Sequence, residues 1–158
     1  MSNWRDSIST SIDITAPPAK VFSVLTDFET YPLWNPFLLS VTPSTTPVLP
    51  GITLTNIIKS GDSNMTFRPT VTAFQKDRRF EWLGKLLWGG LFDGRHHFTI
   101  VESKEGGCTL VHGEDFSGLI VWLGRISGGQ WYKNLMQQTR GGFIRMNEEL
   151  KRRTEETK

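Results

Sequence analysis

The feature that most constrains the fold is a change in hydrophobic periodicity near residue 130. Before it, short segments alternate apolar and polar residues, which is typical of half-buried β-strands. After it, residues 130–153 contain no proline, and apolar residues recur at helical spacing. We therefore expect an α+β fold in which a curved antiparallel β-sheet is wrapped around a long C-terminal α-helix.

Prolines and glycines separate the expected elements. Residues 7–14 form a first strand, and Pro17-Pro18 opens a helix because proline is tolerated in a first helical turn. Only a short helical turn fits between Pro32 and Pro36, so two short helices follow the first strand. The remaining strands are expected at residues 37–41, 52–59, 65–74 and 79–84, followed by a hairpin within residues 93–118.

The long helix is expected to present one apolar face to the sheet. Ser127 and Gln130 form a capping box ahead of it. The face consists of Trp131, Leu135, Thr139, Gly142, Phe143, Met146 and Leu150. Gly141-Gly142 interrupts this face, and each glycine should cost about 1 kcal/mol relative to alanine. Two explanations stay open, namely close packing against a bulky core residue such as Trp82, or space for a ligand between helix and sheet.

Bulk composition excludes several classes of protein. A chain of 158 residues suits a single domain, residues 1–158. The formal charge of +2 is small and dispersed, which argues against nucleic-acid binding. The single cysteine, Cys108, excludes an internal disulfide and a cysteine-based zinc cluster. Neither a signal peptide nor a membrane-spanning run is evident, so a cytoplasmic monomer or homodimer is the default expectation, with no cofactor and no metal.

The hairpin within residues 93–118 carries the most informative polar residues. Alternation puts His96 on the same face as Phe98 and Ile100, and it puts His112 and Glu114 on the same face as Leu110 and Phe116. A three-residue loop with Gly107 left-handed would pair Phe98 with Glu114, whereas a five-residue loop would pair His96 with Glu114. In both registers, His96 and Glu114 are direct or diagonal neighbours.

A carboxylate that faces an apolar interior must be paired or take up a proton. His96, His112 and Glu114 could therefore form a satisfied internal cluster, a polar anchor for a ligand, or a general acid–base pair. A metal site is allowed by ligand type, but no metal-specific spacing supports it. His97 alternates outward and is expected to be solvent-exposed, and Arg68 is expected on the surface.

Several stretches resemble a known superfamily. They are APPAKVFSVLTDFETYPLWNP from Ala16, RPTV from Arg68, RFEWLG from Arg79, DGRHHF from Asp93, TLVHGEDFSG from Thr109 and GFIRMN from Gly142. Together they are similar to the START/Bet v 1-like (SRPBCC) superfamily, in its polyketide cyclase/dehydrase branch. The resemblance implies a helix-grip fold with a deep apolar cavity between the sheet and the long helix.

This resemblance does not carry one set of catalytic residues. It implies binding of a hydrophobic small molecule that is lipid-, sterol- or polyketide-like. The alternative is a cyclase or dehydratase that uses His96 and Glu114, with His112, as catalytic groups. The expected ligand-binding residues are Trp34, Phe67, Trp82, His96, Phe98, His112, Glu114, Phe116, Gly142 and Met146.

Overall fold

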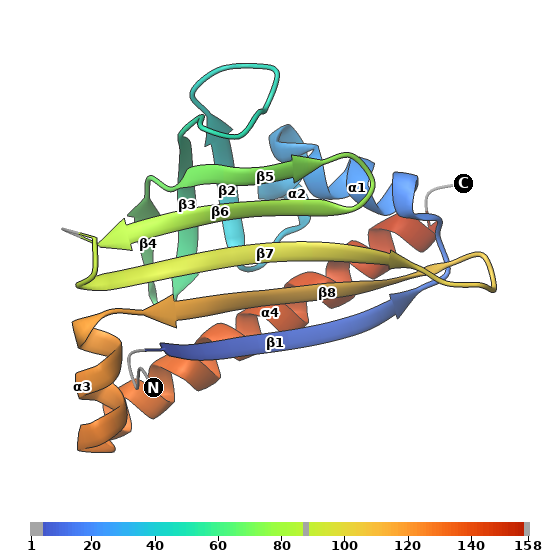
Figure 1. Cartoon of the computed structure of the whole chain (residues 1–158). Helices are drawn as coiled ribbons and strands as arrows, with labels where there is room; N and C mark the ends of the chain where they lie inside the picture. Colours follow the sequence, from blue (N-terminus) through green and yellow to red (C-terminus); the bar gives the residue numbers. More distant parts are fainter. Residues whose placement is uncertain (1–4, 87–88, 157–158) are drawn as a thin grey trace.

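A computed structural model describes residues 5–86 and 89–156, in the order of elements shown in Figure 1. The strands are β1 (Arg5–Ile14), β2 (Leu38–Pro43), β3 (Leu54–Ser60), β4 (Ser63–Phe67), β5 (Thr70–Gln75), β6 (Arg79–Leu86), β7 (Phe92–Glu102) and β8 (Cys108–Ser117). The helices are α1 (Pro18–Thr26), the 3-10 turn η1 (Phe28–Thr30), α2 (Tyr31–Trp34), α3 (Leu119–Ser127) and α4 (Gln130–Glu156).

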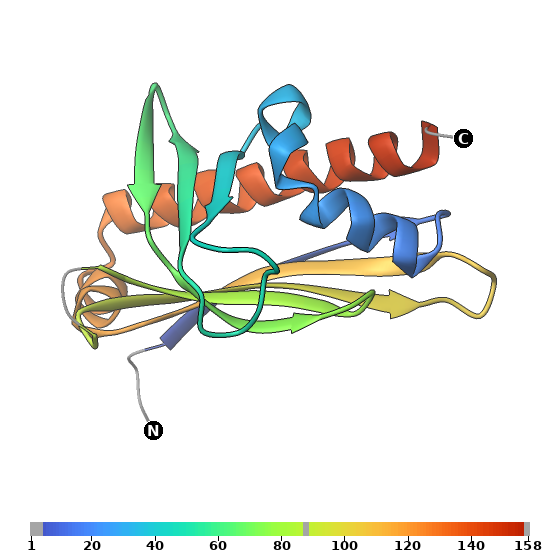
Figure 2. The ribbon, with the colours of Figure 1, turned by 90° about the horizontal axis from the view of Figure 1, so that it is seen from above.

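Two antiparallel sheets and the long helix α4 make up the architecture. The larger sheet has the strand order β1-β8-β7-β6-β5, and the smaller has the order β2-β3-β4. Viewed from above, α1, α2, α4 and the smaller sheet all lie on one side of the larger sheet (Figure 2). This is the helix-grip arrangement, so the predicted fold class is confirmed. None of the helices among residues 5–86 and 89–156 is long and apolar enough to cross a membrane.

The predicted strand 65–74 is wrong as a single element. Its first part belongs to β4, which pairs with β3, and its second part is β5, which pairs with β6. Pro69 lies at the break and has no N–H with which to continue a ladder. The chain therefore passes from the smaller sheet to the larger one at this proline, and its carbonyl still accepts from the Leu54 N–H at 2.9 Å.

The predicted capping box at Ser127 is also wrong. Ser127 is the last residue of α3, a helix that the sequence analysis missed, and its hydroxyl donates to the Gly124 carbonyl. Gly128 follows with a φ of 59°, the left-handed conformation that commonly ends a helix. The hydrophobic run 119–123 between Gly118 and Gly128 was the sequence signal for this helix.

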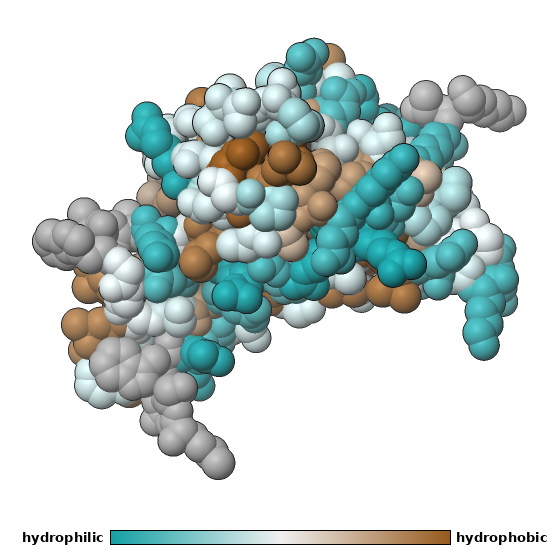
Figure 3. Space-filling view, turned by 45° about the horizontal axis from the view of Figure 1, so that its top comes forward, coloured by the Kyte–Doolittle hydropathy of each residue, from teal (hydrophilic) through white to brown (hydrophobic). Residues whose placement is uncertain are grey.

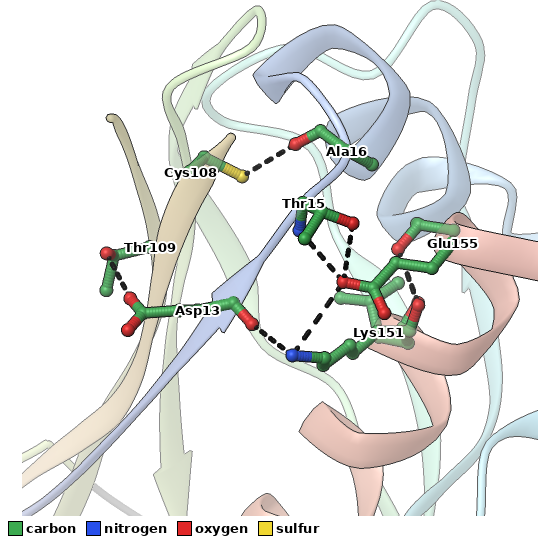
Figure 4. A network of polar contacts seen from close by, with 9 residues as sticks. Asp13, Thr15, Ala16, Cys108, Thr109, Lys151 and Glu155 are labelled. Atoms are coloured by element: carbon green, nitrogen blue, oxygen red, sulfur yellow. Dashed lines mark hydrogen bonds and ion pairs between the residues drawn. The ribbon is translucent and has the colours of Figure 1, made fainter. Parts of the chain in front are cut away.

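The C-terminal half of α4 is fastened to β1 (Figure 4). Glu155 accepts hydrogen bonds from the backbone N–H and the hydroxyl of Thr15, at 2.8 and 3.0 Å. These bonds, the backbone one above all, lower the pKa of the Glu155 carboxyl. Lys151 donates to the Asp13 carbonyl at 2.7 Å, and the Asp13 carboxylate accepts from Thr109 on β8. The helix is thus held against the sheet at the end remote from α3.

Only part of the predicted apolar face of α4 packs in the core. Phe143, Met146 and Leu150 are fully buried, as expected. Trp131 and Leu135, in contrast, are 53% and 38% exposed. The start of α4 contacts the larger sheet through Tyr132 instead, which is buried and donates to the Asp6 carboxylate of β1. Phe143, Met146 and Leu150 therefore pack the interior at one end, whereas Trp131 and Leu135 line a cavity at the other.

Aromatic rings fill the packed end. Phe80 contacts Phe28, Phe74 and Phe98, with ring centroids 5.4–6.3 Å apart. Phe143 of α4 lies against His112 at 4.1 Å between centroids, nearly parallel to it. These rings join the larger sheet to η1 and α4, and none of them lines the cavity described below.

The outer face of the larger sheet carries polar side chains. In the oblique view of Figure 3, hydrophilic residues surround a smaller hydrophobic area near the centre. Glu81 pairs with Arg79 and accepts a hydrogen bond from Thr72 at 2.7 Å. His97 lies on this face, as alternation predicted, but it is half-buried and not fully exposed. The reason is that its ring covers Gly113, the glycine opposite it on β8.

Candidate functional site

The hollow end contains a cavity of about 740 Å³, within the range typical of small-molecule sites. It lies between the larger sheet, the smaller sheet and the first half of α4. Apolar side chains from these elements, from α3 and from the turn before β2 make up most of its wall, namely Phe37, Ile58, Met65, Phe67, Trp82, Phe92, Phe116, Ile120, Trp131 and Leu135. Glu114 is the only carboxylate among the described lining residues.

The hairpin β7–β8 brings the polar residues of the site together. Residues Glu102 and Cys108 pair across a five-residue loop, so His96 lies directly opposite Glu114. The five-residue alternative is therefore confirmed and the three-residue one is wrong. Gly106, with a φ of 94°, takes the left-handed position in place of Gly107. Within the five-residue loop, the Ser103 N–H donates to the Gly107 carbonyl at 2.8 Å.

A continuous chain of hydrogen bonds runs from the cavity into the core. Glu114 Oε2 lies 3.4 Å from His96 Nδ1, and His96 Nε2 lies 2.8 Å from His112 Nε2. His112 Nδ1 lies 2.7 Å from Oδ1 of Asn147 on α4. The Asn147 amide donates to the Thr10 hydroxyl at 3.0 Å, and that hydroxyl donates to the His112 carbonyl at 2.9 Å.

The buried end of this chain determines where its protons lie. Because Asn147 Oδ1 can only accept, His112 carries its proton on Nδ1 and accepts on Nε2. His96 must then donate through Nε2, which leaves a lone pair on Nδ1. With both imidazoles neutral, only a protonated Glu114 can supply the hydrogen for the last contact. Each donor between Glu114 and Asn147 therefore points from the cavity toward Asn147.

Burial favours this neutral arrangement. Desolvation raises the pKa of Glu114 to about 8, and the Asp115 carboxylate adds to the effect. Desolvation also lowers the pKa of His96 to about 3 and that of His112 well below its ordinary value. The 3.4 Å separation between Glu114 and His96 is long for a charge-assisted hydrogen bond, which also favours a neutral pair over an ion pair. Glu114 is thus a carboxylic acid at the cavity wall at neutral pH.

One glycine and an aromatic ring shape the surroundings of this acid. The Glu114 carboxyl lies over Gly94, where a side chain on β7 would collide with it. Trp82 stacks on the His96 imidazole with ring centroids 4.5 Å apart and planes 3° from parallel. The imidazole is therefore held flat, with its Nδ1 edge toward Glu114.

The structure separates the predicted ligand-binding residues into two groups. Five lie on the cavity wall: Phe67, Trp82, His96, Glu114 and Phe116. The other five are buried in the packed core: Trp34, Phe98, His112, Gly142 and Met146. They lie away from the wall because the aromatic cluster fills their half of the interior, a division that strand and helix periodicity does not reveal.

The two glycines of α4 have different surroundings, which bear on the two explanations that the sequence left open. A Cβ on Gly142 would collide with the ring of Phe37, so this glycine allows close packing, although against Phe37 and not Trp82. Gly141 lines the cavity, and its nearest neighbour is the mobile end of Arg145 at 3.2 Å from a Cβ position.

Two functional candidates were missed by the sequence analysis. Asn147 lies between Met146 and Leu150 on the buried face of α4, and Asn56 lies on the inward side of β3 between Leu54 and Ile58. Both are polar residues at positions where the period of the element predicts an apolar one. That mismatch was the available signal. No group of three or more His, Cys, Asp or Glu side chains arranged to hold a metal is found in the described part of the chain.

A cavity enclosed by a helix-grip fold, with a few polar groups on an apolar wall, defines a class of small-molecule-binding domains. The chain belongs to the family described as polyketide cyclase/dehydrase and lipid transport, whose model matches residues 5–155. Comparison with curated protein sequences finds no significant match.

Solved structures share the fold at low sequence identity. The di-domain aromatase/cyclase StfQ of the steffimycin biosynthetic pathway aligns with 98% of this chain at 12% identity and a TM-score of 0.75, but the chain spans only 52% of StfQ. A START superfamily protein from Mycobacterium smegmatis aligns over 96% of this chain and 99% of its own, at 20% identity and a TM-score of 0.70. The Zhui aromatase/cyclase from Streptomyces sp. R1128 gives 12% identity, coverage of 96% and 94%, and a TM-score of 0.72.

Proposed function

We propose that this protein binds a hydrophobic small molecule in the cavity between the larger sheet and α4. The observation that carries the proposal is the 740 Å³ cavity, whose wall is mostly apolar and contains one carboxyl group. Family membership supports the same conclusion, because the family description includes lipid transport. A lipid-, sterol- or polyketide-like molecule would bury its apolar body against Phe67, Trp82 and Phe116.

In this proposal Glu114 anchors the ligand as a neutral acid. Its single proton is donated to His96, so the other oxygen, Oε1, accepts a hydrogen bond from a ligand hydroxyl group without the desolvation penalty of a buried charge. Trp82 and His96 form the adjoining wall, and the remaining core residues of the predicted set act by holding these groups in place.

The test combines native mass spectrometry of the purified protein with displacement of a fluorescent apolar dye. Fatty acids, sterols and aromatic polyketides serve as competitors. We expect at least one class to displace the dye. Trp82→Ala should weaken binding, because it removes part of the apolar cavity wall. The control is a substitution at Leu33, which is exposed and not on the cavity wall, and it should leave binding unchanged. If no class displaces the dye from the wild-type protein, the proposal is rejected.

A second candidate is catalysis of enolisation, ring closure or dehydration of a polyketide-like substrate. The hydrogen-bond chain from Glu114 to Asn147 favours it, since a raised pKa suits a general acid. On substrate binding the Glu114 O–H would turn from His96 to a substrate carbonyl oxygen and transfer its proton there, and the resulting carboxylate would take a proton from the neighbouring carbon. The regained proton would restore the hydrogen bond to His96 Nδ1, and His112 and Asn147 would keep the His96 ring in position.

This candidate is tested with Glu114→Gln and His96→Ala, each assayed for turnover and for ligand binding. Gln keeps a donor toward His96 but cannot transfer a proton. Loss of turnover with retained binding supports the enzyme, and the rate should fall above about pH 8 as the acid ionises. Turnover like that of the wild type in both variants excludes these residues from the chemistry.

A further inference from the structure

Asn56 is a buried amide with no partner in the part of the structure described. It lies on β3, with Val41 of β2 and Phe67 of β4 as its register neighbours, and its exposed fraction is 0%. Neither Nδ2 nor Oδ1 makes a hydrogen bond to any described residue. The same residue lines the cavity. A fully buried side chain with both polar atoms unpaired is rare in folded proteins.

The other buried asparagines show what a structural role looks like. Asn35 accepts from the backbone N–H groups of Phe37 and Leu38, at 3.0 and 2.9 Å, and so holds the turn before β2. Asn147 uses both ends of its amide within the chain that begins at Glu114. Asn56 does neither, and its neighbours along the inward face of β3 are Leu54 and Ile58. A leucine at this position would satisfy the fold better than the amide does.

We propose that Asn56 is a specificity-determining residue that hydrogen-bonds a hydroxyl group of an otherwise apolar ligand. The amide has an acceptor, Oδ1, beside a donor, Nδ2, and a hydroxyl group can donate to the first and accept from the second. A carboxylate, which only accepts, would leave Oδ1 unpaired. This inference rests on the proposed ligand-binding function and adds a second polar contact, on the smaller sheet, to the one that Glu114 provides on the larger sheet.

The ligand class that follows is an apolar molecule with at least two oxygen substituents. Both are hydroxyl groups, one directed at Asn56 on β3 and the other at the accepting oxygen of Glu114 on β8. A hydroxyl ligand would pair the Asn56 atoms that a pure hydrocarbon of the same shape leaves unpaired, and the site should therefore prefer the hydroxyl ligand. Discrimination by an unpaired amide is stronger than discrimination by the shape of an apolar wall.

The test compares probe pairs that differ only by hydroxyl against methyl: para-phenylphenol with para-methylbiphenyl, and a naphthol with the matching methylnaphthalene. Dissociation constants are measured for the wild-type protein, Asn56→Leu and the control Asn64→Leu. Asn64 is exposed on β4, outside the cavity wall, so its replacement is the same chemical change at a neutral place.

We expect the wild type and the control to prefer the hydroxyl probe of at least one pair by about tenfold or more, and Asn56→Leu to lose this preference while it still binds the methyl probe. We also expect the unliganded Asn56→Leu protein to melt at least about 3 °C above the wild type, because it no longer buries an unpaired amide.

Two results would overturn the inference while leaving the proposed function intact. One is an unchanged hydroxyl preference in Asn56→Leu, which would mean that the amide holds only cavity water. The other is a lower melting temperature for this variant, which would give Asn56 a structural role. If the wild type binds neither member of either pair, and no apolar dye either, the proposed function fails and the inference fails with it.

Discussion

Replacing Glu114 by Gln should remove most of the pH dependence of stability that this protein shows between pH 6.5 and 9. In the native state Glu114 is protonated and hydrogen-bonds to His96, and desolvation raises its pKa to about 8. In the unfolded state it is ionised above about pH 4.5. The substitution keeps the side-chain length and an N–H donor for His96 Nδ1, so it isolates the ionisation.

The sign follows from proton uptake. A carboxyl whose native pKa is raised contributes stability that is fully present below its unfolded pKa, and this contribution is lost as the pH rises through the native pKa. Between these two values the native state binds the extra proton, so stability falls as pH increases. His96 acts in the opposite direction, since its depressed pKa removes stability only below about pH 6.5. The interval above pH 6.5 therefore reports on Glu114.

The magnitude follows from the same values. Raising the carboxyl pKa from 4.5 to about 8 corresponds to about 5 kcal/mol over the whole titration. Only the part above pH 6.5 is observed, about 2 kcal/mol between pH 6.5 and 9. For a chain of this size the wild-type melting temperature should drop by about 4–8 °C across that interval.

The assay is urea and thermal unfolding of both proteins at pH 6.5, 7.5 and 9. Cys108, whose thiol pKa is raised by burial, is common to both, so the difference between the two curves isolates Glu114. A carboxyl C=O band in the infrared difference spectrum at pH 6.5, absent from Glu114→Gln, would identify the proton directly. Parallel pH profiles for the two proteins, or wild-type stability that rises between pH 7 and 9, would refute the reasoning.

Three further substitutions test the packing of α4. Gly142→Ala should destabilise the protein by about 1–3 kcal/mol because its Cβ collides with Phe37, and the double variant with Phe37→Leu should recover most of the loss in a urea-unfolding cycle. Gly141→Ala should stabilise it by up to about 1 kcal/mol, since only the flexible end of a side chain is displaced; equal effects at both glycines would contradict the model of the helix face. Asn147→Leu should lower the free energy of unfolding by about 1–3 kcal/mol, because it leaves Nδ1 of His112 unpaired. A variant as stable as the wild type would show that the hydrogen bond between His112 and Asn147 does not stabilise the fold.

Local sequence patterns were sufficient for most elements. Alternation identified β1, β6, β7 and β8, and the proline-free run after residue 130 identified α4. Errors arose where one residue carried two signals. Ser127 satisfies a capping box and also ends α3, and Pro69 sits inside an alternating run that two different sheets share. Short-range patterns do not state which partner a strand selects.

What the sequence by itself determined was the fold class and the inward side of the β7–β8 hairpin, because both depend on the spacing of residues along the chain. It placed His96, His112 and Glu114 on one face but left their register open. Tertiary structure alone decided that register, which half of the interior stays hollow, and the direction of the proton chain. These depend on Thr10, Asn56 and Asn147, which meet the cavity or the hairpin from distant elements. Hydrogen-bond direction and cavity shape depend on these long-range contacts, which the local periodicity of the sequence does not predict.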